Sequence, residues 1–264
     1  MPELVSRGDP RRSMALLWGK CEPPARGPKQ GVTVEQIVGA AIELADTEGI
    51  EAVSMRKVAE RLERSAMSLY TYVPSKHELF DLMLDAVQGE GLVDLDTSAG
   101  WRGAAEGWAR AAWAGYERHP WVLHVAGARP TLGPNETAAF EAGVRIFDGI
   151  GLSGVEMTRA FVAMASYVGG AAKSVADARA AEATTGMTDD EWWEARSPLI
   201  DELVPDYAER FPLLTRLAAE QAFDQIDRAP GDETPYLERD LLDSFEFGLA
   251  RLLDGIEAFV ARRG

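Results

Sequence analysis

Hydroxyl and basic side chains gather within residues 54–76 of this chain. Ser68, Thr71 and Tyr72 carry short or ring hydroxyls, which suit hydrogen bonds to base edges and to phosphates. Lys76 follows a serine at an expected helix start, where a lysine and free backbone N–H groups together favour a phosphate. The other basic residues of this stretch that we expect to face solvent are Arg56, Lys57, Arg61 and Arg64. These residue types at this spacing indicate recognition of nucleic acid rather than catalysis.

The elements that position these side chains are two short helices joined by a tight turn. We expect the helices over 54–61 and 66–72, with the hydroxyls on the second, which is the arrangement of a helix-turn-helix. A preceding helix over 33–48 would pack against both. The apolar residues that would form this small core are Ile37, Leu44, Val53, Val58, Leu62, Leu69 and Val73.

The motifs of this region resemble those of the tetracycline-repressor (TetR) family of one-component regulators. The resemblance lies in I-x-x-A-A-I-E-L-A-D-x-E-G at 37–49, S-M-R-K-V-A-E-R-L at 54–62 and S-L-Y-T-Y-V-x-S-K-x-E-L at 68–79. Further along, L-G-P-N-E at 132–136 and F-G-L-x-R-L-L-D-G-I-E at 247–257 resemble the C-terminal domain of tetracycline-repressor-like proteins. The resemblance implies a homodimer that binds a palindromic operator and leaves the DNA when a small molecule binds the C-terminal domain.

The resemblance also implies which residues contact bases and phosphates. By their place in the motifs they are Arg56, Lys57, Ala66, Met67, Ser68, Tyr70, Thr71, Tyr72 and Lys76. One residue departs from the family pattern, because glycine is usual where Glu63 stands, in the turn after Leu62. A left-handed conformation there would cost glutamate roughly 1 kcal/mol and bring its charge near phosphate. Either the turn is reshaped or the unit binds DNA more weakly than is typical.

The net charge of −16 looks unsuited to DNA until it is divided along the chain. Residues 1–80 carry 11 Lys and Arg and 11 Asp and Glu, so they are neutral and the whole acidic excess lies after them. Phosphate would repel the acidic body and accept only the N-terminal end. The composition therefore argues against non-specific nucleic-acid binding but not against a dedicated DNA-reading unit.

The whole chain is expected to be all-α, because apolar residues recur at steps of three and four and period-two runs are absent. Capping boxes that begin at Thr33, Ser75, Ser153 and Thr188 mark helix starts. The expected helices span 33–48, 54–61, 66–72, 75–88, 99–118, 135–149, 153–180, 189–203, 209–222 and 235–262. We predict a mostly extended arm, a DNA-binding domain, and a larger helical domain for ligand binding and dimerisation, at 1–30, 31–78 and 79–264.

Three segments need interpretations of their own. Residues 1–30 are rich in Pro, Gly and Arg, and the apolar cluster Met14–Trp18 within them predicts a short helical turn docked on the body; a partner-binding segment is the alternative. The stretch 223–234 is typical of a loop. The connection 180–206 is long and carries two adjacent tryptophans, so it is either a lid or a surface helix.

The larger domain carries two sets of apolar residues with different expected roles. Stripes on two long helices suit core packing, and the resemblance favours a four-helix bundle between two subunits formed by Phe161, Val168, Phe245, Leu249, Leu252 and Ile256. A second set is aromatic and Met-rich and suits a site for a small apolar or aromatic ligand: Trp108, Trp113, Tyr116, Phe147, Met164 and Tyr167. Plain core packing is the alternative for each member of this second set.

Other patterns predict no further chemistry. Gly149–Gly154 matches the dinucleotide fingerprint G-x-G-x-x-G, but it follows a helical pattern rather than a strand and so predicts an interhelical turn. His119 and His124 lie on either side of Pro120, a poor arrangement for a metal, and Cys21 has no histidine nearby. We expect no metal, no cofactor and no enzymatic activity. A single cysteine, an N-terminus without an apolar core and the lack of a long apolar stretch predict a cytoplasmic protein without a membrane segment.

The sequence leaves several functions open. The leading interpretation is a repressor that a small molecule releases from DNA. An activator or a ligand-independent regulator fits the same motifs. A protein-interaction adaptor with a degenerate helix-turn-helix rests on Glu63, and an enzyme with an appended DNA-binding unit lacks a visible acid–base or nucleophile cluster.

Overall fold

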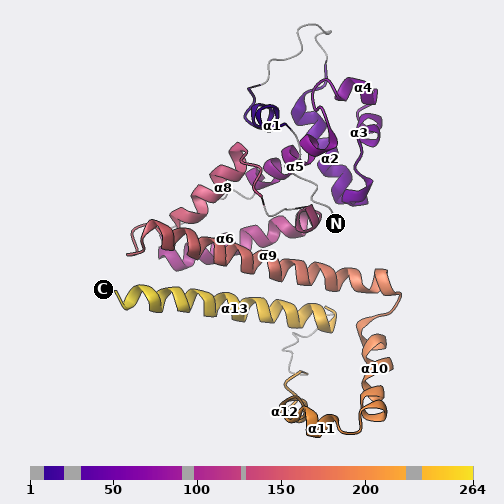
Figure 1. The fold of residues 1–264 in the computed structure, drawn as a ribbon, viewed down its shortest axis with the longest axis vertical. Coiled ribbons are helices and arrows are strands. Elements are labelled where there is room, and N and C mark those ends of the chain that lie inside the picture. The colour runs from indigo at the N-terminus through magenta and orange to yellow at the C-terminus, as the bar shows by residue number, and fades with distance from the viewer. Residues whose placement is uncertain (1–8, 21–30, 91–97, 126–128, 224–233, 264) are drawn as a thin grey trace. The chain divides into compact units, whose positions relative to one another are not determined.

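The computed structural model describes residues 9–20, 31–90, 98–125, 129–223 and 234–263. Over these ranges the chain folds into thirteen α-helices and one 3₁₀ turn, without a β-strand (Figure 1), which confirms the all-α prediction. None of the described helices is both long and apolar enough to cross a membrane. Cys21 and all but the two ends of the loop predicted at 223–234 lie outside the described residues.

The chain divides into two compact units. The first comprises Met1–Gly169 and Leu253–Gly264, and the second comprises Gly170–Leu252. Two long helices, α9 (Gly154–Thr185) and α13 (Tyr236–Ala261), contribute to both units. The other helices of the first unit are α1 (Pro10–Leu17), α2 (Val34–Glu48), the 3₁₀ turn η1 (Ile50–Ala52), α3 (Met55–Arg61), α4 (Ala66–Leu69), α5 (Lys76–Glu90), α6 (Gly100–Arg118), α7 (Val122–Val125) and α8 (Pro134–Arg145).

Helices α2 and α5 form the centre of the apolar core in the first unit. Their largest buried side chains are at most 2% exposed: Ile37, Leu44, Leu79, Phe80 and Met83. Leucines of α1 and valines of α7 belong to the same cluster. Because burying one large apolar side chain contributes about 1.5–3 kcal/mol, this cluster ties the N-terminal helices to the residues that follow α6.

The four predicted capping boxes all mark a helix start, because α2, α5, α9 and α10 begin at the residue after each predicted cap. The boxes at Thr33 and Thr188 are complete, with the hydroxyl and the side chain three residues on each accepting a backbone N–H. At Ser153 the box is altered, because Glu156 accepts both the backbone N–H and the hydroxyl of the serine, at 2.8 and 2.7 Å. At Ser75 the hydroxyl accepts a backbone N–H two residues on, at 3.1 Å, and donates to the glutamate of the motif.

The glycine-rich segment 149–154 is a turn between α8 and α9, as predicted. Helix α8 ends at Arg145, so the predicted end at 149 is wrong. Gly149 and Gly151 have φ values of +76° and +91°, a conformation that a residue with a Cβ resists. These two glycines keep the chain from continuing α8 and let it turn into α9.

The second unit consists of the later part of α9, then α10 (Asp189–Leu203), α11 (Tyr207–Arg210), α12 (Pro212–Ala219) and the first part of α13. The single helix predicted over 209–222 is therefore wrong. Pro212 has no N–H to donate and disfavours helical geometry at the residue before it, so α11 ends there and α12 begins. Helix α9 runs beyond the predicted residue 180 and stops before Gly186, whose φ is +71°.

The connection with two adjacent tryptophans is helical, and residues 190–200 of α10 are all exposed. Trp192 is 37% exposed and lies beneath the guanidinium of Arg196, 4.4 Å from its ring centre. Elsewhere in the second unit, Arg179 of α9 forms an ion pair with Glu238 of α13 at 2.8 Å.

Helix α1 is longer than the helical turn predicted in the N-terminal arm, and it docks on the body. The Asp9 side chain caps it by accepting a backbone N–H of the first turn at 2.9 Å. Leu16 and Leu17 are buried in the cluster that α5 shares. Trp18 donates its ring N–H to the backbone oxygen of Leu132 at 3.0 Å, so α1 also contacts the segment before α8.

Candidate nucleic-acid interface

Helices α2, α3 and α4 form a small unit whose core is the one predicted from the sequence. Ile37, Leu44, Val53, Val58, Leu69 and Val73 are at most 2% exposed, and Leu62 is half-buried. Serines fix the start of both short helices. The side chain of Ser54 accepts the backbone N–H of Lys57 at 3.3 Å, and that of Ser65 accepts the backbone N–H of Ser68 at 3.3 Å.

The turn between α3 and α4 keeps its left-handed residue although that residue is Glu63, with a φ of +54°. The backbone N–H of Arg64 donates to the oxygen of Ala59 at 2.9 Å, and that of Glu63 donates to the oxygen of Glu60 at 3.1 Å. This pair of bonds is the Schellman arrangement, which ends helices at a left-handed residue that is usually glycine. The turn is therefore not reshaped, and Glu63 retains a strain of roughly 1 kcal/mol.

The second helix of the unit is shorter than the predicted 66–72. Helix α4 ends at Leu69, and the N–H groups of Thr71 and Tyr72 donate three residues back, that of Tyr72 to the oxygen of Leu69 at 2.9 Å. Pro74 disfavours helical geometry at Val73 and so limits how far the segment can continue, but it acts four residues after the end of α4. The predicted recognition helix is thus one α-helical turn followed by a tighter turn.

On α4 and in the two residues that follow it, the exposed side chains are Met67, Tyr70 and Thr71. Met67 is 76% exposed and Tyr70 is 43% exposed, while Ala66 beside them is half-buried. A methionine this exposed contributes little to folding, and its thioether suits apolar contact with a thymine methyl group in the major groove.

Two predicted DNA contacts already have local partners. The Ser68 hydroxyl donates to the backbone oxygen of Ser65 at 2.6 Å, within the cap of α4. The ring of Tyr72 packs against the core, and a Cβ added at Gly31 would lie 2.7 Å from its hydroxyl oxygen. Both side chains are therefore held in defined positions.

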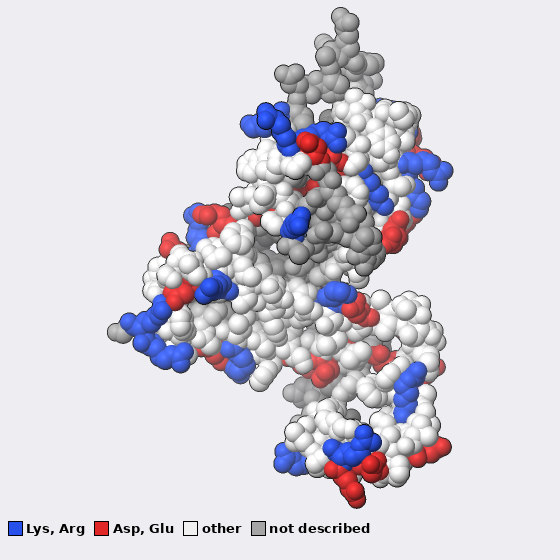
Figure 2. All heavy atoms as spheres, viewed as in Figure 1, with Lys and Arg blue, Asp and Glu red and all other residues white. Residues whose placement is uncertain are grey.

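The predicted basic contacts on α3 have acidic partners in the same unit, and blue and red side chains lie side by side on this surface in Figure 2. Arg56 is 79% exposed and lies 3.7 Å from Glu60. The ammonium of Lys57 lies 2.8 Å from Glu48, and its hydrogen bond and charge lower the pKa of that carboxyl. Exposed pairs of this kind contribute at most about 1 kcal/mol, so a phosphate could replace the carboxylates.

Lys76, at the start of α5, lies over the ring of Phe80 with its ammonium 4.9 Å from the ring centre. Two further exposed arginines flank the strained turn, and the sequence assigned no contact to them. Arg61 lies 3.8 Å from an exposed glutamate of α2, and Arg64 donates to the backbone oxygen of Glu63 at 3.2 Å. The sequence could have indicated phosphate contacts for both, because solvent-facing arginines beside a helix-turn-helix are suited to bind phosphate.

Two family profiles match the chain. Residues 37–83 match "Bacterial regulatory proteins, tetR family", and residues 95–260 match "Tetracyclin repressor-like, C-terminal domain". The chain is also 41% identical over 263 residues to the HTH-type transcriptional repressor DrrR1 of Streptomyces coeruleorubidus, an alignment that covers 99% of this chain and 90% of DrrR1. The chain belongs to the TetR family. The helix-turn-helix of this TetR-family protein is therefore the DNA-binding element of a transcription regulator.

The fold of this TetR-family protein is also similar to that of solved regulators from Streptomyces coelicolor. Apo ActR matches with a TM-score of 0.66 and 23% identity, over 91% of this chain and all of ActR. The transcriptional regulator SCO7222, described as a TetR, matches with a TM-score of 0.62 and 26% identity, over 86% of this chain and 98% of that protein. A helix-turn-helix followed by a larger helical region is common to the family.

In the C-terminal region of this TetR-family protein, the predicted ligand residues differ in their burial. Phe147 and Met164 are fully buried, which fits the alternative of plain core packing. The ring of Trp108 meets that of Phe161 edge to face, with the ring centres 5.1 Å apart. Burial raises the pKa of the Tyr116 hydroxyl. The members of the set that keep part of their surface exposed are Trp108, Trp113, Tyr116 and Tyr167.

Phe161 was predicted at a dimer interface, but it is covered by its own chain. Its ring also meets Phe140, with the ring centres 5.4 Å apart, and a Cβ added at Gly143 would lie 2.0 Å from a ring carbon. Only 6% of Phe161 is exposed. It therefore belongs to the core between α6, α8 and α9 rather than to a surface for a second subunit.

The other predicted dimer residues divide by exposure. Val168, Phe245 and Leu249 are at most 4% exposed, whereas Leu252 and Ile256 are half-buried. The periodicity identifies an apolar stripe but not whether its own chain covers it, so the first three need the same correction as Phe161. The large apolar side chains that α9 and α13 leave exposed are Val155, Val162, Phe247 and Phe259.

The two histidines near Pro120 do not share a site. His119 is buried and contacts Asp46 and Glu90, whereas His124 is exposed on α7. Within the described residues, no group of three or more His, Cys, Asp or Glu side chains is placed to hold a metal ion.

Proposed function

We propose that this protein is a transcriptional repressor that binds a palindromic operator as a homodimer and is released from it by a small apolar or aromatic ligand. The main support for operator binding is the intact turn at Glu63, which presents Met67, Tyr70 and Thr71 beside exposed arginines. The 41% identity to DrrR1, which is named a repressor, supports the direction of regulation.

The proposal divides the chain as the sequence does, with DNA binding in 31–78 and dimerisation and ligand binding in 79–264. The DNA contacts are the nine residues named above, and Arg61 and Arg64 join them as phosphate contacts. A two-fold axis would place the two reading helices about 34–36 Å apart on one face of the DNA. The exposed residues Val155, Val162 and Phe259 support a dimer surface on α9 and α13.

The ligand part rests on the aromatic side chains that remain partly exposed in the C-terminal region. Tryptophan and tyrosine walls suit flat, apolar molecules, because large rings bury much apolar area against them. ActR has been solved in complex with actinorhodin and with (S)-DNPA. That protein shares the fold of this chain at 22–23% identity, so its ligands support a ligand-binding role and do not define the ligand here.

A gel-shift titration against the DNA that flanks its own gene tests the proposal. We expect specific, salt-sensitive binding with one dimer per operator. Arg56→Ala should weaken binding of all sequences and reduce the salt slope by about 1, because one phosphate contact is lost. Arg145→Ala is the matched control, since Arg145 is 70% exposed and pairs with an acid one helical turn away, as Arg56 does.

A panel of flat aromatic compounds in the same assay tests release. Release by one compound, with a matching rise in the unfolding temperature of the free protein, is the expected result. If Arg56→Ala and Arg145→Ala change DNA binding equally, the proposed DNA-binding site is wrong. No specific binding to the flanking DNA would favour the adaptor alternative, and binding that no compound alters would favour a ligand-independent regulator.

A further inference from the structure

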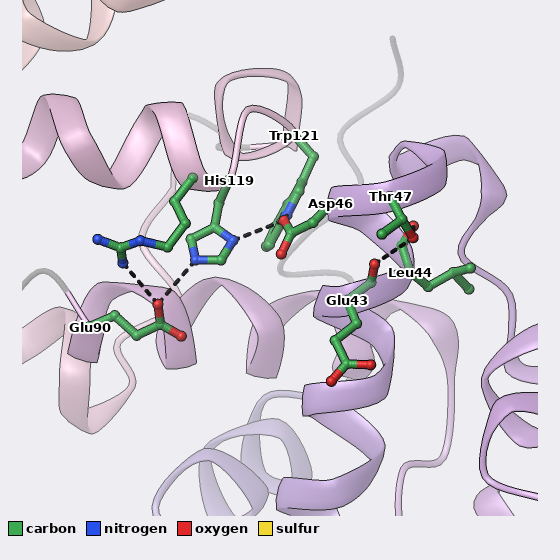
Figure 3. A network of polar contacts seen from close by, with 8 residues as sticks. Glu43, Leu44, Asp46, Thr47, Glu90, His119 and Trp121 are labelled. Atoms are coloured by element: carbon green, nitrogen blue, oxygen red, sulfur yellow. Dashed lines mark hydrogen bonds and ion pairs between the residues drawn. The ribbon is translucent and has the colours of Figure 1, made fainter.

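The imidazole of His119 lies between two carboxylates that come from different helices (Figure 3). Its Nδ1 is 2.9 Å from Oδ1 of Asp46 on α2, and its Nε2 is 3.1 Å from Oε2 of Glu90 on α5. His119 is only 5% exposed, so its ring nitrogens face the two carboxylates rather than bulk water. Both ring nitrogens are thus committed to acidic oxygens.

Two more side chains complete this joint, which consists of Asp46, Glu90, Arg118, His119 and Trp121. The ring N–H of Trp121 donates to Oδ1 of Asp46 at 2.7 Å, and Arg118 donates to Oε2 of Glu90 at 3.1 Å. The charged groups that face His119 are therefore one acid from α2, one acid from α5, and the arginine next to it in the chain. Burial raises the pKa of Glu90, but the hydrogen bonds from His119 and Arg118 outweigh burial and leave that pKa below its ordinary value.

The joint connects the two parts of the chain that the family profiles describe. Asp46 lies within the matched residues 37–83, and His119 lies within the matched residues 95–260. Asp46 belongs to the last turn of α2, which packs against α3 within the reading unit formed by α2, α3 and α4. Tyr116, one turn before His119 on α6, belongs to the proposed ligand set. A shift of α6 would therefore reach α2 through a direct side-chain contact.

The number of hydrogen bonds in the joint depends on the protonation of the imidazole. A protonated imidazole donates from both nitrogens, so it can bind Asp46 and Glu90 together. A neutral imidazole has one donor, and its other nitrogen presents a lone pair to a carboxylate oxygen. The joint therefore has all of its hydrogen bonds only while the imidazole is protonated, because each ring nitrogen faces a carboxylate oxygen.

We propose that His119 is a positioning residue for operator binding, which holds the reading unit on the C-terminal region and does so more firmly when its imidazole is protonated. Holding each reading unit in a fixed orientation reduces the ordering that operator binding requires. The inference rests on the proposed repressor function, and it adds a dependence on pH that the function alone does not require.

Operator affinity measured at constant ionic strength tests the inference. We expect wild-type affinity to fall about 3- to 10-fold when the pH is raised until the imidazolium has lost a proton, as one charge-assisted hydrogen bond of a partly exposed network is lost. His119→Gln should bind with the weaker affinity at every pH and show no such slope. His124→Gln, which changes an exposed histidine on the neighbouring helix, should retain the wild-type slope.

A measurement without DNA separates failure of this inference from failure of the proposed function. The indole N–H resonance of Trp121 reports on Asp46, so it should move with pH in the wild-type protein over the same range as the affinity. A resonance that stays fixed would overturn the inference even if His119→Gln does not fold. A slope that persists in His119→Gln, or an affinity that rises with pH, would overturn it as well. Absence of operator binding at every pH would count against the proposed function instead.

Discussion

Replacing Glu63 by glycine should stabilise the reading unit and tighten operator binding through two separable effects. The residue has a φ of +54° within an otherwise regular Schellman turn, so glycine can occupy the position without any change in its hydrogen bonds. The side chain is exposed next to α4, where a carboxylate would lie near DNA phosphates. Backbone strain and charge therefore both act against the present residue.

The two effects can be given magnitudes. The left-handed conformation costs a residue with a Cβ roughly 1–2 kcal/mol, and the greater freedom of glycine in the unfolded chain offsets about 0.5–1 kcal/mol of that gain. The net stabilisation is about 0.5–1 kcal/mol, or roughly 1–3 °C in the unfolding midpoint. Removing an exposed like charge beside phosphate should raise operator affinity about two- to threefold at low salt, and less at high salt.

Glu63→Gln separates the two effects, because glutamine removes the charge and retains the strain. We expect Glu63→Gly to unfold at a higher temperature than both Glu63→Gln and the wild-type protein, which should unfold together. Both variants should bind the operator more tightly than wild type, by a margin that shrinks as salt increases. Thermal unfolding and operator titrations at two salt concentrations measure these differences.

Two results would refute the reasoning. Equal unfolding temperatures for the glycine and glutamine variants would mean that the left-handed residue carries no strain. An unchanged affinity for Glu63→Gln would mean that the turn does not face phosphate, and the orientation proposed for the reading unit would be wrong.

Two further substitutions probe how the helices are packed. Gly143→Ala should destabilise the protein by about 1–3 kcal/mol in thermal unfolding, because its Cβ would lie 2.0 Å from a phenylalanine ring carbon of α9; Gly107→Ala, on α6 with nothing within 4 Å, should be neutral or stabilising. Arg12→Ala should destabilise by about 1 kcal/mol at neutral pH, because Glu78 is only 1% exposed and loses its ion pair at 2.9 Å, whereas the neighbouring exposed Arg11→Ala should not. Burial raises the pKa of Glu78, but hydrogen bonds outweigh burial and lower that pKa below its usual 4.5. The stability difference between the wild-type protein and Arg12→Ala should therefore be present above pH 4.5 and disappear as the pH falls through the lowered pKa.

Helix starts were predictable from the sequence because capping is local chemistry. A hydroxyl residue followed three positions later by Glu or Gln marked the first residue of four helices, even where the bonds of the box differed from the expected ones. Helix ends were less predictable. The effect of Pro212 on the segment of α11 and α12 is also local, and this proline would have predicted the break between the two helices.

Contacts between distant residues were not predictable in the same way. The spacing of His119 and His124 argued against a shared site, but nothing in the sequence near His119 points to its contact with Asp46 on α2. Four of the six predicted dimer residues are buried by their own chain, because a stripe at steps of three and four records that residues are apolar, not which surface covers them. Burial of Phe161 by its own chain became visible only with α6 and α8 in place.

Helix α5 takes part in several contacts between distant residues, because its acidic residues bind three other parts of the first unit. Glu78 pairs with α1, and Glu90 contacts the end of α6. Asp85 accepts two backbone N–H groups at the start of α8, at 2.9 and 3.1 Å, and its burial raises its pKa. A Cβ at Gly133 would lie 2.2 Å from that carboxylate, so the glycine of the L-G-P-N-E motif provides the space for it.

The helix that begins shortly after α4 is therefore attached to α1, α6 and α8 through charged hydrogen bonds rather than through apolar packing alone. Apolar contacts tolerate sliding, whereas a charged hydrogen bond weakens steeply when its geometry changes. A displacement of α6 or α8 must consequently either break one of these bonds or carry α5 with it. Since α5 and α2 share one apolar core, the second outcome moves the reading unit as a body. If the proposed ligand site on α6 is correct, ligand binding there would by this route alter the orientation of side chains on α4 without any change within the helix-turn-helix itself.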